Sequence, residues 1–444
     1  MTGMPTARSI LAALGPWLAA CGQPTTSLDP QPAPPSTNDG VDTNDGVDTN
    51  DDTNDDAGDD TESGPPPVEL CDADCSPLLL PTWTYEGPAG FRSVVELVVT
   101  PEGSLRLGVQ QANKTFALVQ LSPDGQLEWS VAPSAPVAST QLESMALHPS
   151  GDVVLSATRS PLASPTAPVA VLARFDVVER AFVWERETPL DVGPMIRPHA
   201  AGVSILDDDR IAHTVVHGAL EEQLVRLQVH DDEGALLLQK TLSIAPPLGG
   251  GWLPLVVGSP SGELLIADAD WDDETESSVP NTERLLPPDY TIFSRLLRPL
   301  PLDELAIDSR GRRIELAHSR SDATVTLLPA SFRSSGPLRW EAALPIITTS
   351  ATRPTLALGP DDDVYVATRS TPRVLPTDPY VVLLEVARWS SEGQLRWQSR
   401  RSLDMMATDD PIELAIDADD GLLVATVVEG HLTVVRYEQA CSCR

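Results

Sequence analysis

Short runs in which apolar and polar residues alternate, separated by Gly, Asp and Pro, fill most of the chain. The clearest case is residues 121–129 (LSPDGQLEW), where Asp124-Gly125 stands between one apolar run and a second that contains Leu127 and Trp129. Asp-Gly between two alternating runs is a strong β-hairpin signal. The pattern predicts a hairpin whose returning strand carries Leu127 and Trp129 on one face.

This hairpin pattern recurs, clearly at residues 389–397 (WSSEGQLRW) and more weakly at 175–184, 230–239 and 332–340. A second hairpin, in which two apolar strands flank a Gly- or Asp-containing turn, occurs seven times, at residues 95–109, 144–158, 202–216, 254–268, 304–318, 355–369 and 413–427. Its first and last turns are six repeats apart, at about 53 residues per repeat. Four short strands in such a unit are typical of a β-propeller blade. The sequence therefore predicts an all-β fold, a β-propeller of seven four-stranded blades.

The outer strand of a blade needs a large apolar residue, because the gap between neighbouring sheets widens away from the axis. We expect four tryptophans to fill this gap, namely Trp129, Trp184, Trp340 and Trp397. The alternative interpretation is a cage of tryptophans that stacks on a ligand. The third unit carries Leu238-Gln239 in place of Trp, and the fourth carries a polar insertion at residues 270–289.

The seventh unit ends early, because residues 432–437 (LTVVRY) leave no room for a fourth strand. An unassigned strand at residues 81–85, which contains Trp83, stands at the other end of the repeats. We expect this N-terminal strand to complete the last blade and close the ring.

Four cysteines flank these two strands: Cys71, Cys75, Cys441 and Cys443. In an exported protein they indicate disulfides, with three possible pairings. Ring closure would bring both pairs to one edge and favours bonds between the two ends of the chain. Local pairing of Cys71 with Cys75 stays open, and zinc binding by the same four residues is the third alternative.

The N-terminus resembles that of bacterial lipoproteins. An apolar segment at residues 9–20 follows the single charge of Arg8 and ends in Leu-Ala-Ala before Cys21. Its length fits a signal-peptide core and is short for a membrane span. The resemblance implies that residues 1–20 are a signal peptide and that Cys21 carries the lipid. Gly22 in the next position favours the outer membrane; an ordinary signal peptide is the alternative.

Residues 21–67 contain the lipidated Cys and a low-complexity tether, with 12 acids and no Lys or Arg between Asp29 and Glu62. A segment without apolar residues to bury is expected to be disordered. The propeller domain then spans residues 68–444. The whole chain has 30 Lys+Arg against 65 Asp+Glu, a formal charge of −35. Such a charge argues against binding nucleic acid.

The search for catalytic and metal-binding motifs gives one weak candidate. Alternate carboxylates at Asp268, Asp270 and Asp272 follow an apolar strand and could converge on calcium, which takes six to eight oxygen ligands. The EF-hand spacing is missing, so a solvated acidic stretch is the alternative and no other cofactor is expected. His213 and His217 are the closest histidine pair, but on a strand they are too far apart to share a metal. No nucleophile elbow, zinc-protease helix, phosphate loop or dinucleotide fingerprint occurs.

The lipoprotein box, the Asp/Thr/Pro tether and the Asp-Gly-x-Leu-x-Trp hairpins together resemble secreted β-propeller lipoproteins of the myxobacterial type. The blades are more distantly similar to quinoprotein-type repeats, but lack their Ala-x-Asp-x-x-Thr-Gly motif. The resemblance implies a non-catalytic platform that binds protein or glycan at the outer membrane, on its periplasmic or outer side. A quinoprotein-like factor for outer-membrane protein assembly is the second hypothesis. A propeller enzyme, such as a glycan lyase, hydrolase or dehydrogenase, is the third.

Overall fold

The computed structural model describes fifteen stretches of the chain: residues 78–132, 138–161, 168–190, 199–206, 209–219, 222–242, 255–258, 262–272, 277–297, 304–320, 327–335, 341–343, 354–370, 382–403 and 412–440. They lie in one compact unit, Glu69–Arg444. Every regular element among them is a β-strand. No helix in these stretches is long and apolar enough to cross a membrane.

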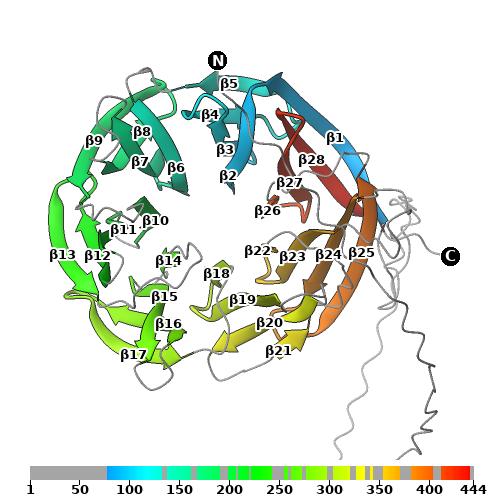
Figure 1. The fold of residues 1–444 in the computed structure, drawn as a ribbon. Coiled ribbons are helices and arrows are strands. Elements are labelled where there is room, and N and C mark those ends of the chain that lie inside the picture. Colours follow the sequence, from blue (N-terminus) through cyan, green and yellow to red (C-terminus); the bar gives the residue numbers. More distant parts are fainter. Residues whose placement is uncertain are drawn as a thin grey trace, which may run out of the picture. The chain divides into compact units, whose positions relative to one another are not determined.

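The described strands form seven four-stranded antiparallel sheets that follow one another around a circle in a propeller-like arrangement (Figure 1). We number them sheets 1 to 7, starting from β2. The innermost strands are β2 (Phe91–Val99), β6 (Ala138–Leu147), β10 (His199–Ile205), β14 (Leu255–Gly258), β18 (Glu304–Ile307), β22 (Thr355–Leu358) and β26 (Glu413–Ile416). The second strands are β3 (Leu105–Gln111), β7 (Val153–Pro161), β11 (Ile211–Ala219), β15 (Leu264–Asp272), β19 (Arg313–Arg320), β23 (Val364–Ser370) and β27 (Leu422–Val428).

The outer half of each sheet is a further strand pair. The third strands are β4 (Phe116–Leu121), β8 (Val169–Asp176), β12 (Glu222–His230), β16 (Ser277–Leu286), β20 (Leu327–Ser335), β24 (Val382–Trp389) and β28 (His431–Ala440). The outermost strands are β5 (Leu127–Val131), β9 (Ala181–Pro189), β13 (Leu236–Leu242), β17 (Thr291–Leu297), β21 (Glu341–Ala343), β25 (Leu395–Leu403) and, in sheet 7, β1 (Leu78–Ala89).

Each sheet is covered on both faces by its neighbours, which explains why its second strand is apolar almost throughout. In β3, Leu107 and Val109 join a buried cluster that includes Leu423 and Val434 of sheet 7. Gly108, on the other face of β3, approaches Leu142 of sheet 2. Buried clusters of this kind link every sheet to the next among the described residues, and the cluster around Leu107 links sheet 7 to sheet 1. A strand buried on both faces has no reason to alternate apolar with polar residues.

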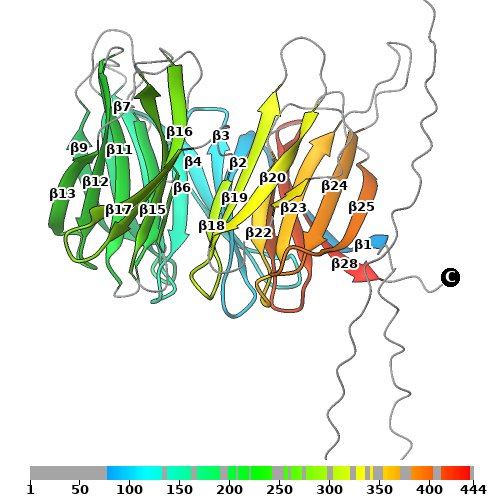
Figure 2. The ribbon, with the colours of Figure 1, turned by 90° about the horizontal axis from the view of Figure 1, so that it is seen from below.

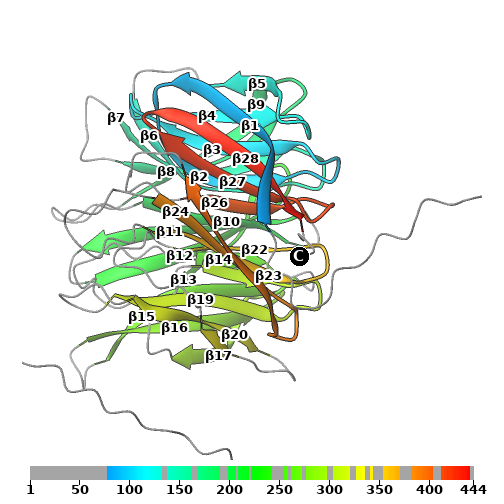
Figure 3. The same cartoon turned by 90° about the vertical axis from the view of Figure 1, so that its right-hand side faces the viewer.

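The N-terminal strand β1 pairs with β28 and is the outermost strand of sheet 7 (Figure 3). Leu78 lies opposite Ala440 at one end of the pair, and Ala89 lies opposite His431 at the other. The register shifts after Pro81 and around Pro88. An edge strand tolerates proline, because the face of the backbone without a partner strand needs no donor.

Two tryptophans on outermost strands cover the outer turn of the next sheet. Trp83 of β1 lies on Gly125 of sheet 1, and its indole Nε1–H donates to the Pro123 carbonyl at 3.1 Å. Trp184 of β9 covers Gly234 of sheet 3 in the same way, with a 2.9 Å bond to the Asp232 carbonyl. A Cβ on Gly234 would stand 2.8 Å from the indole, so the glycine leaves the space that the ring occupies.

Between sheets 3 and 4 the large residue comes from the turn and the smaller one from the outermost strand. Sheet 3 has Leu238 in place of Trp, and the turn of sheet 4 supplies Tyr290, which packs in the same buried cluster. The Tyr290 carbonyl accepts a 2.8 Å hydrogen bond from Lys240 Nζ, and the Arg210 guanidinium stands over its ring. The missing tryptophan is thus compensated by a large residue from the facing turn.

The prediction for the returning strand of the first hairpin is half wrong. Trp129 is buried as expected, at 8% exposure, but Leu127 is 47% exposed. The cause is a register shift that pairs Gln120 with Trp129 and Leu121 with Leu127. This β-bulge adds one residue and turns Leu127 outward. The same shift pairs Arg388 with Trp397 and Trp389 with Leu395 in sheet 6.

The predicted polar insertion of sheet 4 is also wrong. Strand β15 continues to Asp272, and β16 begins at Ser277, so the polar stretch forms the two middle strands of a sheet. Backbone pairing with a neighbouring strand overrides the polar composition here. Of the four predicted gap-filling tryptophans, Trp184 and Trp397 pack against buried clusters like Trp129, whereas Trp340 lies outside the described residues.

The first expected outcome concerns Gly125, which combines a φ of 75° with the contact to Trp83. Gly125→Ala should lower the free energy of unfolding by roughly 2–4 kcal/mol, because a left-handed alanine and an overpacked contact add. Gly151→Ala is the matched control, with a φ of 89° and open space around it, and should cost about 1 kcal/mol. Chemical denaturation measures both. Equal losses in Gly125→Ala and Gly151→Ala would contradict the packing role. A difference between the two that persists when Trp83→Ala is added to both would also contradict it.

Candidate functional site

The described turns between first and second strands, and between third and fourth strands, lie at one end of the sheets, which we call the turn end; it is the lower end in Figure 2. The turn between the first and second strands closes with two backbone hydrogen bonds, as in Thr100 N to Ser104 O and Gly103 N to Thr100 O, both 2.8 Å. The same pair of bonds recurs at His148, Asp308 and Asp417. These turns hold the side chains of the polar network described next.

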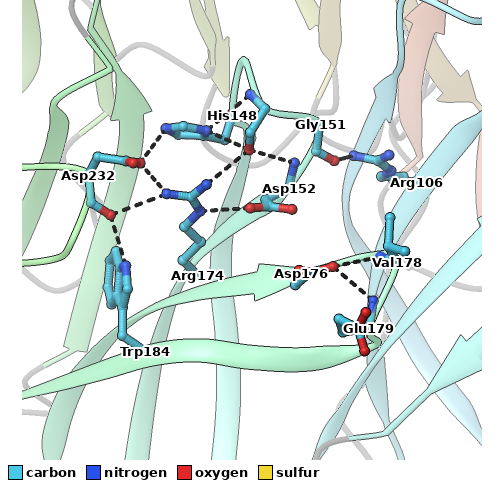
Figure 4. Close-up of polar contacts among 11 residues, drawn as sticks. Arg106, His148, Gly151, Asp152, Arg174, Asp176, Val178, Glu179, Trp184 and Asp232 are labelled. Carbon is cyan, nitrogen blue, oxygen red and sulfur yellow. Dashed lines mark hydrogen bonds and ion pairs between the residues drawn. The ribbon is translucent and has the colours of Figure 1, made fainter.

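Arginines on third strands connect neighbouring sheets at the turn end. Arg174 of β8 donates from Nε to Asp152 at 2.7 Å and also pairs with Asp232 in a turn of sheet 3 (Figure 4). Arg388 of β24 repeats the arrangement, with Asp363 at 2.8 Å and Asp420 of sheet 7 at 3.0 Å. In both cases the guanidinium binds one carboxylate of its own sheet and one of the next, so it joins the sheets.

His148 connects Ser150 with Asp232 in the order of a Ser-His-Asp triad (Figure 4). The Ser150 hydroxyl lies 2.9 Å from Nδ1, and Nε2 lies 3.0 Å from the Asp232 carboxylate. Nδ1 also accepts the Ser150 backbone N–H at 3.2 Å, so the neutral ring carries its proton on Nε2. The hydroxyl itself accepts a 3.1 Å hydrogen bond from Arg174.

Comparison among the sheets identifies this group as a cap of the turn. At the position of His148, Asp308 accepts the backbone N–H of Arg310 at 3.1 Å, and Asp417 accepts that of Asp419 at 2.9 Å. His148 Nδ1 accepts the corresponding N–H. The position of Ser150 beside His148 is therefore explained by the turn, in which His148 accepts the Ser150 backbone N–H. The group as a whole joins sheets 2 and 3, and its geometry gives no reason to assign a nucleophile.

Four of the innermost strands carry a glutamate at a similar distance from the turn end, and in the longer strands β2 and β6 this position lies halfway along the strand. Strands β18 and β26 begin at Glu304 and Glu413, four residues before their turns. Glu96 has the same offset in β2, and Glu143 lies one residue further from its turn in β6. These four partly buried residues, Glu96, Glu143, Glu304 and Glu413, are the central glutamates. None of the predicted residues pointed to them, although their offset from the turns is visible in the sequence.

Two of the central glutamates have a raised pKa. Burial raises the pKa of Glu96 to about 8; the charge of Glu304 on the other side of the circle adds to the rise, and a hydrogen bond from the Met145 backbone opposes it. Burial likewise raises the pKa of Glu143 to about 8, although Thr158 Oγ1 donates to it at 3.2 Å. A neutral carboxyl donates as well as accepts hydrogen bonds. Such groups fit hydroxyl-bearing, uncharged ligands better than cations.

The predicted calcium residues lie on β15, where Asp268, Asp270 and Asp272 pair with Asn281, Val279 and Ser277. Their side chains lie outside the described residues, as do Cys21, Cys71, Cys75, Cys441 and Cys443. Within the described stretches, no group of three or more His, Cys, Asp or Glu side chains could hold a metal. His213 is buried between sheets 2 and 3, and the side chain of His217 is not described.

No protein-family model and no curated protein matches the chain. Two solved structures show a distant likeness. One is "Drosophila Semaphorin 1a, extracellular domains 1-2", with 11% identity, a TM-score of 0.45, and coverage of 80% of this chain and 88% of that one. The other is the polysaccharide lyase Uly1, with 7% identity, a TM-score of 0.45, and coverage of 79% and 90%. This level of likeness assigns neither a family nor an activity.

The raised pKa values give a stability test. Since the folded-state pKa of Glu96 and Glu143 is about 8 against an ordinary 4.5, the folded chain should lose stability as the pH rises from 4.5 through 8. Glu96→Gln and Glu143→Gln keep the shape without the charge. Each should raise the melting temperature relative to the parent by about 2 °C at pH 8.5 and leave it unchanged at pH 4.5. Exposed Glu102→Gln is the control; an equal effect there would contradict the assignment.

Proposed function

We propose that this protein is a non-catalytic binding platform, a seven-bladed β-propeller closed by β1 and anchored through a lipid on Cys21 at the outer membrane. Residues 1–20 would be the signal peptide, and residues 21–67 the tether. The observation that carries the binding role is a pair of carboxyls with raised pKa halfway along the innermost strands β2 and β6. Because arginine–carboxylate links between sheets occupy the turn end, we place the binding surface at the opposite end.

Connection lengths favour the same end. At the turn end, strands β2 and β3 are joined by residues 100–104, and β24 and β25 by residues 390–394. Strands whose facing ends lie at the opposite end are further apart in the sequence, with 11 residues between β23 and β24, 12 between β13 and β14, and 11 between β21 and β22. Long connections on a rigid scaffold are where binding residues concentrate. The ligand that fits protonated carboxyls is rich in hydroxyl groups, so within the protein-or-glycan class we favour a glycan.

Crosslinking in the native cell tests this role. The full-length protein is recovered from solubilised membranes, and attached protein and glycan are identified. Glu96→Ala with Glu143→Ala should lose at least tenfold of the recovered material, whereas Glu102→Ser with Asp124→Ser at the turn end should retain it. The reverse pattern would overturn the proposed binding end.

The recovered material also separates the alternatives. Outer-membrane assembly components would support the assembly factor. Cleavage of a recovered glycan by the purified protein, detected as newly formed chain ends, would support the enzyme and contradict a non-catalytic role. An intact glycan or a single defined protein supports the platform.

We further propose that disulfides join the two ends of the repeat domain. The described pairing ends with Leu78 opposite Ala440, and the same register extended three residues outward would set positions 75 and 443 opposite each other. The register therefore favours a Cys75–Cys443 bond and leaves Cys71 to Cys441. Oxidation of each thiol pair transfers two electrons and two protons to a disulfide-donating oxidoreductase of the export compartment.

Peptide mapping without reduction checks the pairing. We expect a crosslinked peptide that contains Cys75 and Cys443, and its loss in Cys75→Ser. Linkage of Cys71 to Cys75, with no bond to the C-terminal residues, would contradict the proposed linkage.

A further inference from the structure

The joint between sheets 2 and 3 has a polar middle layer. Two small apolar clusters lie there, one around Val154, Leu172 and Ile211, the other around Ala170 and Val215. Between them stand polar side chains from both sheets: Ser156, Thr188, His213 and Gln228. By contrast, the joint between sheets 7 and 1 holds one continuous apolar cluster.

Two histidines in this joint each leave one ring nitrogen without a hydrogen bond. His213 lies 3.0 Å from the Ser156 hydroxyl through Nε2, and its Nδ1 has no partner. His230 lies 3.3 Å from the Gly234 carbonyl through Nδ1, and its Nε2 has no partner. Both rings are buried, at 1% and 5% exposure. Protonation would therefore place a charge inside the joint, where the neutral Gln228 side chain faces His213.

The surrounding charges do not provide a partner for these added protons. Arg174, Arg186 and Arg226 face the joint, as do Asp152, Asp231, Asp232 and His148. Asp152 and Asp232 already bind Arg174, and Arg186 donates to the carbonyls of Gly234 and Glu233. His148 already pairs with Asp232 through Nε2.

We propose that the joint between sheets 2 and 3 is an acid-sensitive seam, which opens before the other joints when His213 and His230 take up protons. Opening lets both imidazoles reach water and replaces the buried Ser156–His213 contact. It would expose the polar layer between the sheets, and it does not depend on the proposed ligand.

The pKa directions agree with this geometry. Burial lowers the pKa of His213 to about 3; the nearby His230 adds to the shift, and Gln228 opposes it. Burial also lowers the pKa of His230. A lowered folded-state pKa means that the closed seam is fully stable above about pH 6.5 and loses stability as the pH falls toward 3. Exposure of His213 alone to water should make the equilibrium constant for opening larger at pH 4.5 than at pH 7.5, on the order of 100-fold.

Two equivalent indoles provide a matched measurement. Trp184 Nε1–H donates across this seam to Asp232, and Trp83 Nε1–H donates across the apolar joint to Pro123. In the full chain with ¹⁵N-labelled tryptophan, both signals are assigned with Trp184→Phe and Trp83→Phe. Indole N–H exchange is measured at pH 7.5 and 4.5 and normalised to free tryptophan. We expect the Trp184-to-Trp83 ratio of exchange rates to rise at least tenfold at the lower pH.

Histidine variants decide whether the imidazoles cause the change. His213→Gln with His230→Gln should reduce the rise to less than threefold, and His230→Gln alone serves if the double variant does not fold. His431→Gln, at an exposed ring on sheet 7 whose Nδ1 contacts the Gly87 carbonyl at 2.9 Å, should keep the full rise. A ratio that does not change with pH, or a rise that survives removal of the seam histidines, overturns the proposal.

Discussion

The structure depends on filling the wedge between neighbouring sheets. Innermost strands lie close together around the centre, and the gap between two sheets grows toward the outermost strands. Trp83 and Trp184 fill that gap, and the turn glycines Gly125 and Gly234 make room for them. Each tryptophan also satisfies a turn carbonyl of the next sheet. One outer residue therefore couples two sheets through packing and a hydrogen bond, and a change on either side is felt by both.

Between sheets 3 and 4, Leu238 stands where other outermost strands carry Trp, and Tyr290 of the facing turn supplies the missing volume. The gap is therefore filled, but from the other side. Where the outermost strand has the smaller side chain, the facing turn supplies the larger one. Close packing explains this exchange, because a wedge filled from neither side leaves a cavity, and one filled from both sides is strained. The degenerate third repeat and the unusual fourth turn are thus two parts of one contact.

The joints are not equal in chemistry, and this has consequences for function. Arginine–carboxylate links between sheets occupy the turn end. Halfway along the innermost strands, burial raises the pKa of two glutamate carboxyls to about 8. Between sheets 7 and 1 the buried apolar residues form one continuous cluster. Between sheets 2 and 3 a polar layer separates them into two small clusters. Local stability should therefore vary around the circle.

The hairpins, the all-β class and the burial of Trp129 could be predicted from sequence, because alternation and Asp-Gly turns act between residues close in the chain. The orientation of Leu127 could not be predicted, because a single β-bulge shifts the register of the strand and changes the face on which the residue lies. Nor could the polar strands β15 and β16, whose pairing overrides composition. The contact of Trp83 with Gly125, the seam histidines and the electrostatic effect of Glu304 on Glu96 were decided by the tertiary structure alone. Each joins residues far apart in the chain, and only the cyclic order of sheets brings them together.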